Sequence, residues 1–179
     1  MHPLIPQAVG LLAVVLFVSS YQLKSRKSII ICNVVSRFLY ILQYLLLGAI
    51  SGAVLDILGT ISSVIAEKKD SALVRRYSKT IFILMSALMI ASGVSISVIN
   101  KNPLDLFALV GILLQSGAFW LTKEATIRKV SLLGSPFWLT YNLSSKAYGS
   151  AVGDALTMIS IIVAMIKYKN SARPKENKQ

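Results

Sequence analysis

Long apolar runs, each about the length of a membrane-spanning helix, dominate this sequence. A helix needs about 20 apolar residues to cross about 30 Å of hydrocarbon. A membrane β-barrel is excluded, because its strands alternate apolar and polar residues, whereas runs such as 81–90 are almost unbroken. The sequence predicts an all-α membrane protein with seven transmembrane helices, at residues 4–23, 28–47, 49–66, 80–99, 104–122, 131–146 and 148–166.

The placement of charge excludes a soluble nucleic-acid-binding protein. Charged residues make up 15% of the 179-residue chain, against about 25% in a typical soluble domain. The net charge of +12 would suit a nucleic-acid partner, but the basic residues lie between apolar runs and not along one face. We therefore expect the lipid bilayer as partner and no nucleic acid. The first run is expected to be a retained helix, because its positive charges follow it, unlike those of a signal peptide.

The basic residues also predict an orientation. Four segments hold sixteen of the nineteen Lys and Arg residues: those after the first, third and fifth spans, and the tail after the seventh. The opposite connections carry only Lys101 and Lys146, and Arg37 lies inside the second span. Basic residues collect on the cytoplasmic side of membrane proteins. The sequence predicts an N-terminus outside and a C-terminus in the cytoplasm.

Comparison of the sequence with itself at an offset of 98 residues indicates an internal repeat. Residues 49–66 and 147–164 are then identical at eight of eighteen positions, and Asp56 aligns with Asp154. The chain is therefore expected to contain two parallel three-helix repeats joined by an inverting helix. The expected organisation is a first repeat at 1–67, a basic loop and inverting helix at 68–102, a second repeat at 103–168, and a mobile basic cytoplasmic tail at 169–179.

Several local features carry a resemblance to a known family. They are Gly10 in the first span, the Arg26-Lys27 end of the first basic connection, the Trp138-x-x-x-Asn142 step, and the small-residue helix around Asp154. On these features the chain, to about residue 170, resembles the uncharacterised YgjV-type family of bacterial inner-membrane proteins. The resemblance implies a multi-pass protein of the bacterial inner membrane.

The three-one-three plan is similar to that of the SWEET sugar facilitators, the PQ-loop transporters and the PnuC vitamin transporters. In SWEET proteins the third helix of each triplet contributes a polar residue, usually Asn, to a central pocket. The matching positions here are Asp56 and Asp154, and this departure argues against sugar binding. The Pro-Gln pair of PQ-loop proteins is half present as Tyr21-Gln22 and missing at Leu121-Thr122.

The two aspartates are the strongest candidates for a binding site. A carboxylate near the middle of a transmembrane helix costs about 2.5–3.5 kcal/mol on insertion scales, so two acids at matching repeat positions call for an explanation. They can bind solute or carry protons, and Trp138 and Asn142 can add a stacking face and an amide. The alternative is that each Asp holds helices together through hydrogen bonds to neighbouring hydroxyl groups.

Other polar residues in the spans are assigned structural roles. Gln43 and Tyr44 are expected to pack between helices, and Asn33 and Gln115 are also assigned to structure. For Arg37 we expect the long side chain to extend toward the cytoplasmic surface, with pairing to Asp56 as the less favoured alternative.

No enzyme signature appears. The only His is His2, a single Cys cannot form a metal cluster, and no Gly-rich phosphate loop is present. We expect no catalysis, metal or cofactor. The sequence predicts a transporter or facilitator of an unidentified small polar solute, for which the two aspartates offer a route to proton coupling. The alternative is a non-transporting scaffold or accessory subunit. Transport would be favoured if both aspartates line one cavity. The scaffold would be favoured if each aspartate lies in a separate helix–helix interface. Oligomeric state does not follow from the sequence.

Overall fold

The computed structural model describes residues 4–171, which form seven α-helices. They are α1 (Leu4–Ser20), α2 (Arg26–Leu47), α3 (Ile50–Glu67), α4 (Ala72–Asn100), α5 (Asp105–Phe119), α6 (Glu124–Ser144) and α7 (Tyr148–Ser171). The all-α prediction is confirmed. Four helices, α2, α3, α4 and α7, are long and apolar enough to cross a membrane, and α1 and α5 are shorter apolar helices.

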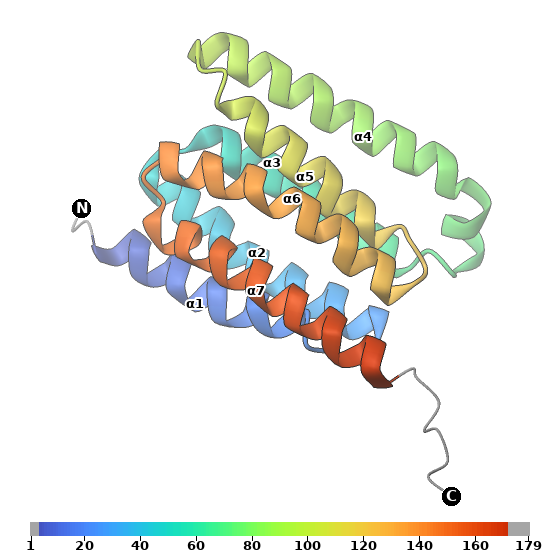
Figure 1. Cartoon of the computed structure of the whole chain (residues 1–179). Helices are drawn as coiled ribbons and strands as arrows, with labels where there is room; N and C mark the ends of the chain where they lie inside the picture. The colour runs from blue at the N-terminus through green and yellow to red at the C-terminus, as the bar shows by residue number, and fades with distance from the viewer. Residues whose placement is uncertain (1–3, 172–179) are drawn as a thin grey trace, which may run out of the picture.

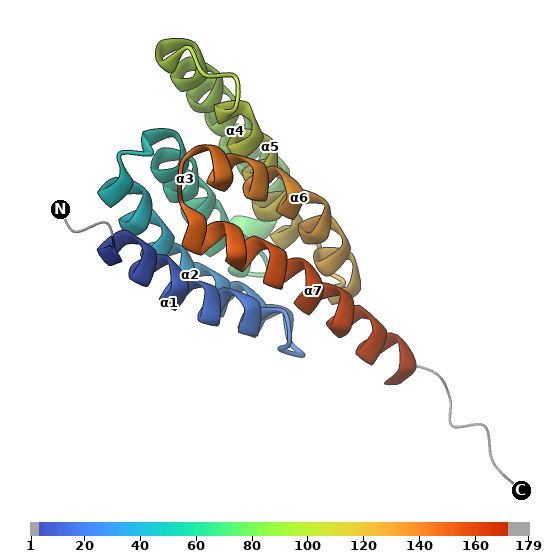
Figure 2. The ribbon, with the colours of Figure 1, turned by 60° about the vertical axis from the view of Figure 1, so that its left-hand side comes forward.

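Six of the helices form a closed ring. In the order of their contacts these are α1, α2, α3, α5, α6 and α7, and α7 packs back onto α1. Helix α4 lies outside the ring, where it packs on α3 and α5 (Figures 1 and 2). The ring encloses an interior to which all six helices contribute side chains.

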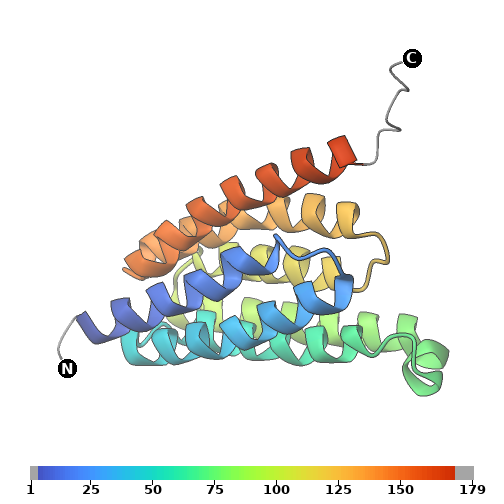
Figure 3. The ribbon, with the colours of Figure 1, turned by 90° about the horizontal axis from the view of Figure 1, so that it is seen from below.

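Consecutive helices run antiparallel, so an odd number of them brings the start of α1 and the end of α7 to opposite ends of the bundle (Figures 1 and 3). The connections after α1, α3 and α5 and the end of α7 lie together. We call this the basic end, because it carries most of the Lys and Arg residues. The other end holds the connections after α2, α4 and α6.

Local sequence explains where several helices stop and start. Ser25 caps α2 by accepting a hydrogen bond from the backbone N–H of Ser28. At the other end of α2, Gly48 adopts a left-handed conformation with φ of 71°, which glycine takes without steric cost. Lys146 holds a similar conformation after α6, with φ of 59°.

The surface and the interior reverse the pattern of a water-soluble protein. Buried positions include charged and amide side chains such as Arg37, Asp56, Gln115 and Asp154. Large apolar side chains such as Ile83 and Leu84 of α4 are more than half exposed. An apolar exterior around a polar interior suits a bundle surrounded by lipid.

Two predicted boundaries need correction. Helix α6 begins at Glu124 and not at residue 131, so Arg128 and Lys129 lie inside a helix. Helix α4 begins at Ala72, so Arg75, Arg76 and Lys79 belong to its first turns and not to a loop. Apolar content alone marks the part of a helix that lipid can surround, and the polar turns beyond it remain helical. Helix α7 ends at Ser171, and residues 172–179 of the expected tail lie outside the described residues.

Candidate functional site

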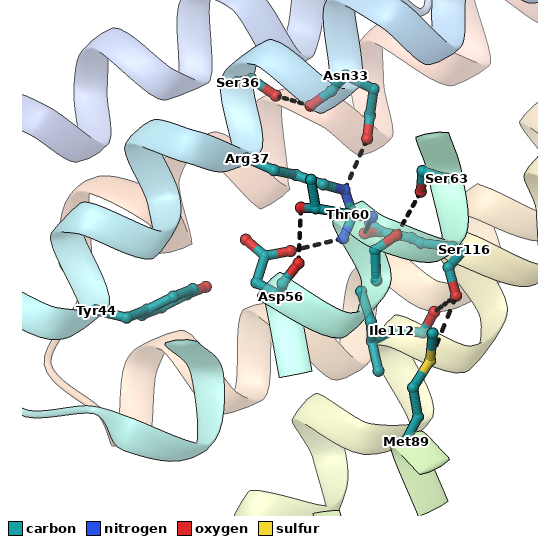
Figure 4. Close-up of polar contacts among 12 residues, drawn as sticks. Asn33, Ser36, Arg37, Tyr44, Asp56, Thr60, Ser63, Met89, Ile112 and Ser116 are labelled. Atoms are coloured by element: carbon teal, nitrogen blue, oxygen red, sulfur yellow. Dashed lines mark hydrogen bonds and ion pairs between the residues drawn. The ribbon is translucent and has the colours of Figure 1, made fainter. Parts of the chain in front are cut away.

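A buried ion pair lies at the centre of the bundle. The Arg37 guanidinium of α2 donates through Nη1 to Oδ1 of Asp56 on α3 at 2.6 Å (Figure 4). The two side chains are only 1% and 5% exposed. The expected extension of Arg37 toward the surface is therefore wrong, and the less favoured pairing with Asp56 is correct.

Neutral side chains complete the surroundings of the guanidinium. Its Nε donates to Oδ1 of Asn33 at 3.0 Å, and its Nη2 donates to Oε1 of Gln115 at 3.2 Å. Gly59 leaves the space that the guanidinium occupies, because a Cβ at this position would lie 2.8 Å from Nη1 of Arg37. Three helices, α2, α3 and α5, thus hold this buried cation in place.

The second aspartate has a different environment. Asp154 of α7 accepts a hydrogen bond through Oδ2 from the amide Nδ2 of Asn142 on α6, at 2.7 Å. The carbonyl Oδ1 of Asn142 accepts from the Tyr44 hydroxyl of α2, at 2.8 Å. The Tyr44 hydroxyl, the Asn142 amide and the Asp154 carboxyl therefore form one chain of hydrogen bonds across the bundle.

Aromatic rings pack beside this hydrogen-bonded chain. The rings of Tyr44 and Trp138 stack with a centroid separation of 6.1 Å and an interplanar angle of 15°. Tyr141 meets both rings edge-on. Trp138 lies close against α5 at Gly111, where a Cβ would approach the indole Nε1 to 2.9 Å.

One cavity brings the two aspartates together. It is lined by nine side chains from α1, α2, α3, α5, α6 and α7, namely Phe17, Arg37, Tyr40, Tyr44, Asp56, Gln115, Trp138, Asn142 and Asp154. All four residues predicted as a site, Asp56, Asp154, Asn142 and Trp138, are among them. The cavity volume is about 20 Å³, which is enough for a water molecule and too small for a sugar.

Sequence reasoning missed several members of this cavity. Tyr44 and Gln115, which were assigned to packing and structure, both line it, and so do Phe17 and Tyr40. Tyr44 carried a usable signal, because the 98-residue shift places it on Asn142. Tyr40 carried the same signal, because the shift places it on Trp138, and Phe17 falls on Gln115, which also lines the cavity. Gln43 does serve packing, and its Oε1 accepts a hydrogen bond from the Ser150 hydroxyl of α7.

Cationic side chains join the helices at the basic end. Arg26, at the start of α2, donates to the carbonyl oxygens of Phe119 and Leu121 at the end of α5, at 2.7 and 3.1 Å, and to that of Ala66 on α3. Lys69 donates to the Leu121 carbonyl at 2.9 Å. Its partial burial and the neighbouring Arg26 lower the pKa of Lys69. The last carbonyls of a helix lack helical partners, so they are good acceptors for cations.

Arg128 makes the equivalent contact on the other side of the ring. From the start of α6 it donates to the carbonyls of Tyr21 and Leu23 after α1, at 3.3 and 2.8 Å. Its guanidinium also lies 4.5 Å from the centre of the Tyr168 ring of α7. Arg26 and Arg128 thus each fasten the α1–α3 side of the bundle to the α5–α7 side.

Neutral hydrogen bonds make the corresponding connections at the opposite end. Gln7 of α1 binds the backbone of Lys146 and Gly149 at 3.1 and 2.9 Å. The backbone N–H of Gly52 on α3 donates to the Tyr141 hydroxyl of α6 at 2.7 Å. The cavity lies between these contacts and those of the basic end. No group of three or more His, Cys, Asp or Glu side chains that could hold a metal ion occurs among residues 4–168.

Comparison with known proteins identifies the family. One protein family, Imp-YgjV, described as bacterial inner membrane protein, matches residues 4–172. The chain belongs to this family. It is accordingly a multi-pass protein of the bacterial inner membrane, in agreement with its apolar helices. No curated protein and no solved structure matches the chain.

Proposed function

We propose that this Imp-YgjV protein transports a small polar solute across the inner membrane through the central cavity, in a proton-coupled process. The observation that carries the proposal is that Asp56 and Asp154, from different sides of the bundle, line the same cavity. Buried ionisable groups are expensive in a membrane protein and mark solute or proton pathways. In a scaffold the two acids could lie between different pairs of helices, because a structural role does not require a common cavity. The shared cavity therefore favours transport.

The contacts between the two sides of the bundle support a repeat of α1–α3 in α5–α7. Gln22 donates to the Ser160 hydroxyl, and Trp120 donates to the Ser62 hydroxyl. A shift of 98 residues converts the first pair into the second. The same shift converts the carbonyls held by Arg128, at residues 21 and 23, into those held by Arg26, at residues 119 and 121. Helix α4 is then the inverting helix of a 3+1+3 arrangement.

This arrangement suggests how the cavity opens. Contacts close it at both ends, so solute enters only if one three-helix unit tilts against the other. Release of Arg26 and Arg128 from their carbonyls opens the basic end, and release of Gln7 and Tyr141 opens the opposite end. The excess of Lys and Arg supports an orientation with the basic end in the cytoplasm and the start of α1 outside.

Uptake by reconstituted vesicles tests the proposal. The purified full-length protein is inserted into liposomes and offered a panel of radiolabelled polar solutes, neutral, anionic and cationic, with and without a pH gradient. We expect uptake of at least one solute above that of protein-free vesicles, with a rate that depends on the gradient. Absence of uptake for every class and both gradient directions would refute transport.

Matched aspartate variants separate a cavity function from a general effect of charge. Asp154→Asn is expected to reduce proton-coupled uptake strongly, because an amide cannot carry a proton in this pH range. Asp56→Asn is expected to reduce uptake because it leaves the buried Arg37 without its counter-charge in the cavity. Asp70→Asn removes an exposed carboxylate at the basic end and is expected to leave uptake unchanged. Normal uptake in both cavity variants, together with lower thermal stability, would assign the aspartates to helix packing.

A further inference from the structure

The charges around the cavity are unequal on its two sides. Arg37 neutralises Asp56 at 2.6 Å. The 98-residue shift places Ser135 where Arg37 stands in the first repeat, so the second repeat has the acid and lacks the arginine. Among the described residues, Asp154 forms no ion pair. The cavity therefore contains one carboxyl group for which the chain supplies no counter-charge.

The hydrogen bonds of Asp154 leave one side of the carboxyl group open. Asn142 binds Oδ2, and within residues 4–168 no group donates a hydrogen bond to Oδ1. Tyr44 orients the Asn142 amide, so the carboxyl group is held in position without being neutralised. A buried carboxyl group in this situation must bind either a proton or a cation.

The walls of the cavity favour a cation over an anion. Four aromatic side chains line it, Phe17, Tyr40, Tyr44 and Trp138, and the faces of aromatic rings attract ammonium groups. An anion would need Arg37, but three of the five N–H donors of its guanidinium already bind Asn33, Asp56 and Gln115, and the Asp56 carboxylate compensates its charge. An anion would also meet the carboxyl group of Asp154.

From these observations we propose that the transported solute is a small organic ammonium ion, which binds Asp154 in exchange for a proton. The inference rests on the proposed transport function and assigns its substrate class. In the closed state the carboxyl group is protonated and the cavity has room for little more than water. When the cavity opens, the O–H bond of Asp154 breaks, its proton passes to water, and the ammonium ion takes its place. Charge in the cavity is the same before and after the exchange.

The exchange predicts that protons compete with the solute. The titratable side chains near Asp154 are Tyr21, in the connection after α1, and Arg37, Tyr40, Tyr44 and Asp56 of α2 and α3. Arg37 and Asp56 neutralise each other, and the tyrosines are uncharged near neutral pH. Asp154 is therefore the group on which the competition acts, and ammonium binding weakens as the pH falls.

Choline and ethanolamine serve as probes in vesicles containing the full-length protein. Choline carries a permanent charge, so it does not leak across the bilayer as a free amine. We expect uptake of at least one probe into vesicles with an acidic interior, and loss of that uptake when the pH gradient is collapsed. Glycerol and acetate, the neutral and anionic controls, should not enter by this route.

Variants at Asp154 link the uptake to its carboxyl group. Asp154→Asn should reduce ammonium uptake at least about tenfold, in line with the loss of a charge-assisted contact. Asp154→Glu retains a carboxylate and should retain measurable uptake, and Asp70→Asn should match the parent protein. Thermal unfolding of each purified variant, with and without choline, checks folding and binding without transport, because a bound ligand raises the melting temperature.

The outcomes separate the substrate class from transport itself. Uptake of a neutral or anionic solute without uptake of either ammonium probe would overturn the inference and leave transport standing. Ammonium uptake that persists in folded Asp154→Asn would overturn the assignment to Asp154. Absence of uptake for every solute would overturn both the inference and the proposed function.

Discussion

The buried ion pair between Arg37 and Asp56 offers the sharpest test of how this bundle is held together. Replacing Arg37 by Met leaves the Asp56 carboxylate without its cation, and it also removes the donors to Asn33 and Gln115. Breaking a buried pair by removal of one partner costs about 3–5 kcal/mol. With side chains only 1% and 5% exposed, we expect Arg37→Met to lower the free energy of unfolding by about this amount.

The double variant Arg37→Met/Asp56→Leu removes both charges. Replacement of a whole buried pair by apolar residues is often neutral or even stabilising. Asn33 and Gln115 still lose their donor, and each unsatisfied buried group costs about 1–3 kcal/mol. The double variant should therefore be more stable than the sum of the two single variants predicts, with a coupling energy of about 2–4 kcal/mol.

Equilibrium unfolding in mixed detergent micelles, followed by far-ultraviolet circular dichroism, measures this double-mutant cycle. The chain supplies a matched control in the pair Lys27–Glu67, whose side chains are 73% and 20% exposed and whose N–O distance is 3.9 Å. Exposed pairs contribute about 0–1 kcal/mol, so the control cycle should give a coupling energy near zero. Equal coupling energies for the two pairs would refute the reasoning from burial.

Three further predictions concern topology, gating and packing. In a Cys32→Ser background, single cysteines at the exposed positions 103 and 148 should react with an impermeant label from outside the cell, whereas those at 24 and 71 should not; labelling at 71 would overturn the orientation. Arg26→Ala or Arg128→Ala removes hydrogen bonds worth about 1.5–3 kcal/mol at the basic end, so a cavity cysteine in place of Tyr40 should react faster from the cytoplasmic face of inverted vesicles; an unchanged rate would show that these arginines do not close the cavity. Gly59→Ala, whose Cβ would lie 2.1 Å from Cδ1 of Ile112, should destabilise the bundle by about 1–3 kcal/mol in thermal unfolding. Its control, Gly117→Ala, meets only Phe82 at 3.8 Å and should be neutral or slightly stabilising; equal melting temperatures would contradict the packing argument.

The sequence alone was sufficient for the number and class of the elements. Hydrocarbon requires long apolar helices, and the seven predicted spans each overlap one helix of the structure. The choice of Asp56 and Asp154 as site candidates also came from the sequence, because an acid within an apolar run is costly and the 98-residue shift aligns one acid with the other. The first turns of α4 and α6 contain basic residues, so apolar content does not mark them as helical, and there the predicted boundaries were wrong.

The partner of Arg37 could not be deduced from its own helix. A long cationic side chain in an apolar span can reach the membrane surface or an acid on another helix, and the choice depends on which face that helix turns inward. Here α2 turns Arg37 toward α3, where Gly59 leaves room for the guanidinium and Asp56 accepts it. A periodic pattern indicates which side of a helix is buried, but it does not identify the residue that this side contacts on the neighbouring helix.

The shared cavity is likewise a property of the tertiary structure. The sequence paired Asp56 with Asp154 by repeat position, yet two equivalent residues could equally have faced two separate seams. Both aspartates line one cavity because the closed ring of six helices directs these faces of α3 and α7 toward a common interior. Tyr44, Gln115, Phe17 and Tyr40 became cavity residues for the same reason. Their chemistry was visible in the sequence, but their common location depends on contacts between helices that lie far apart along the chain.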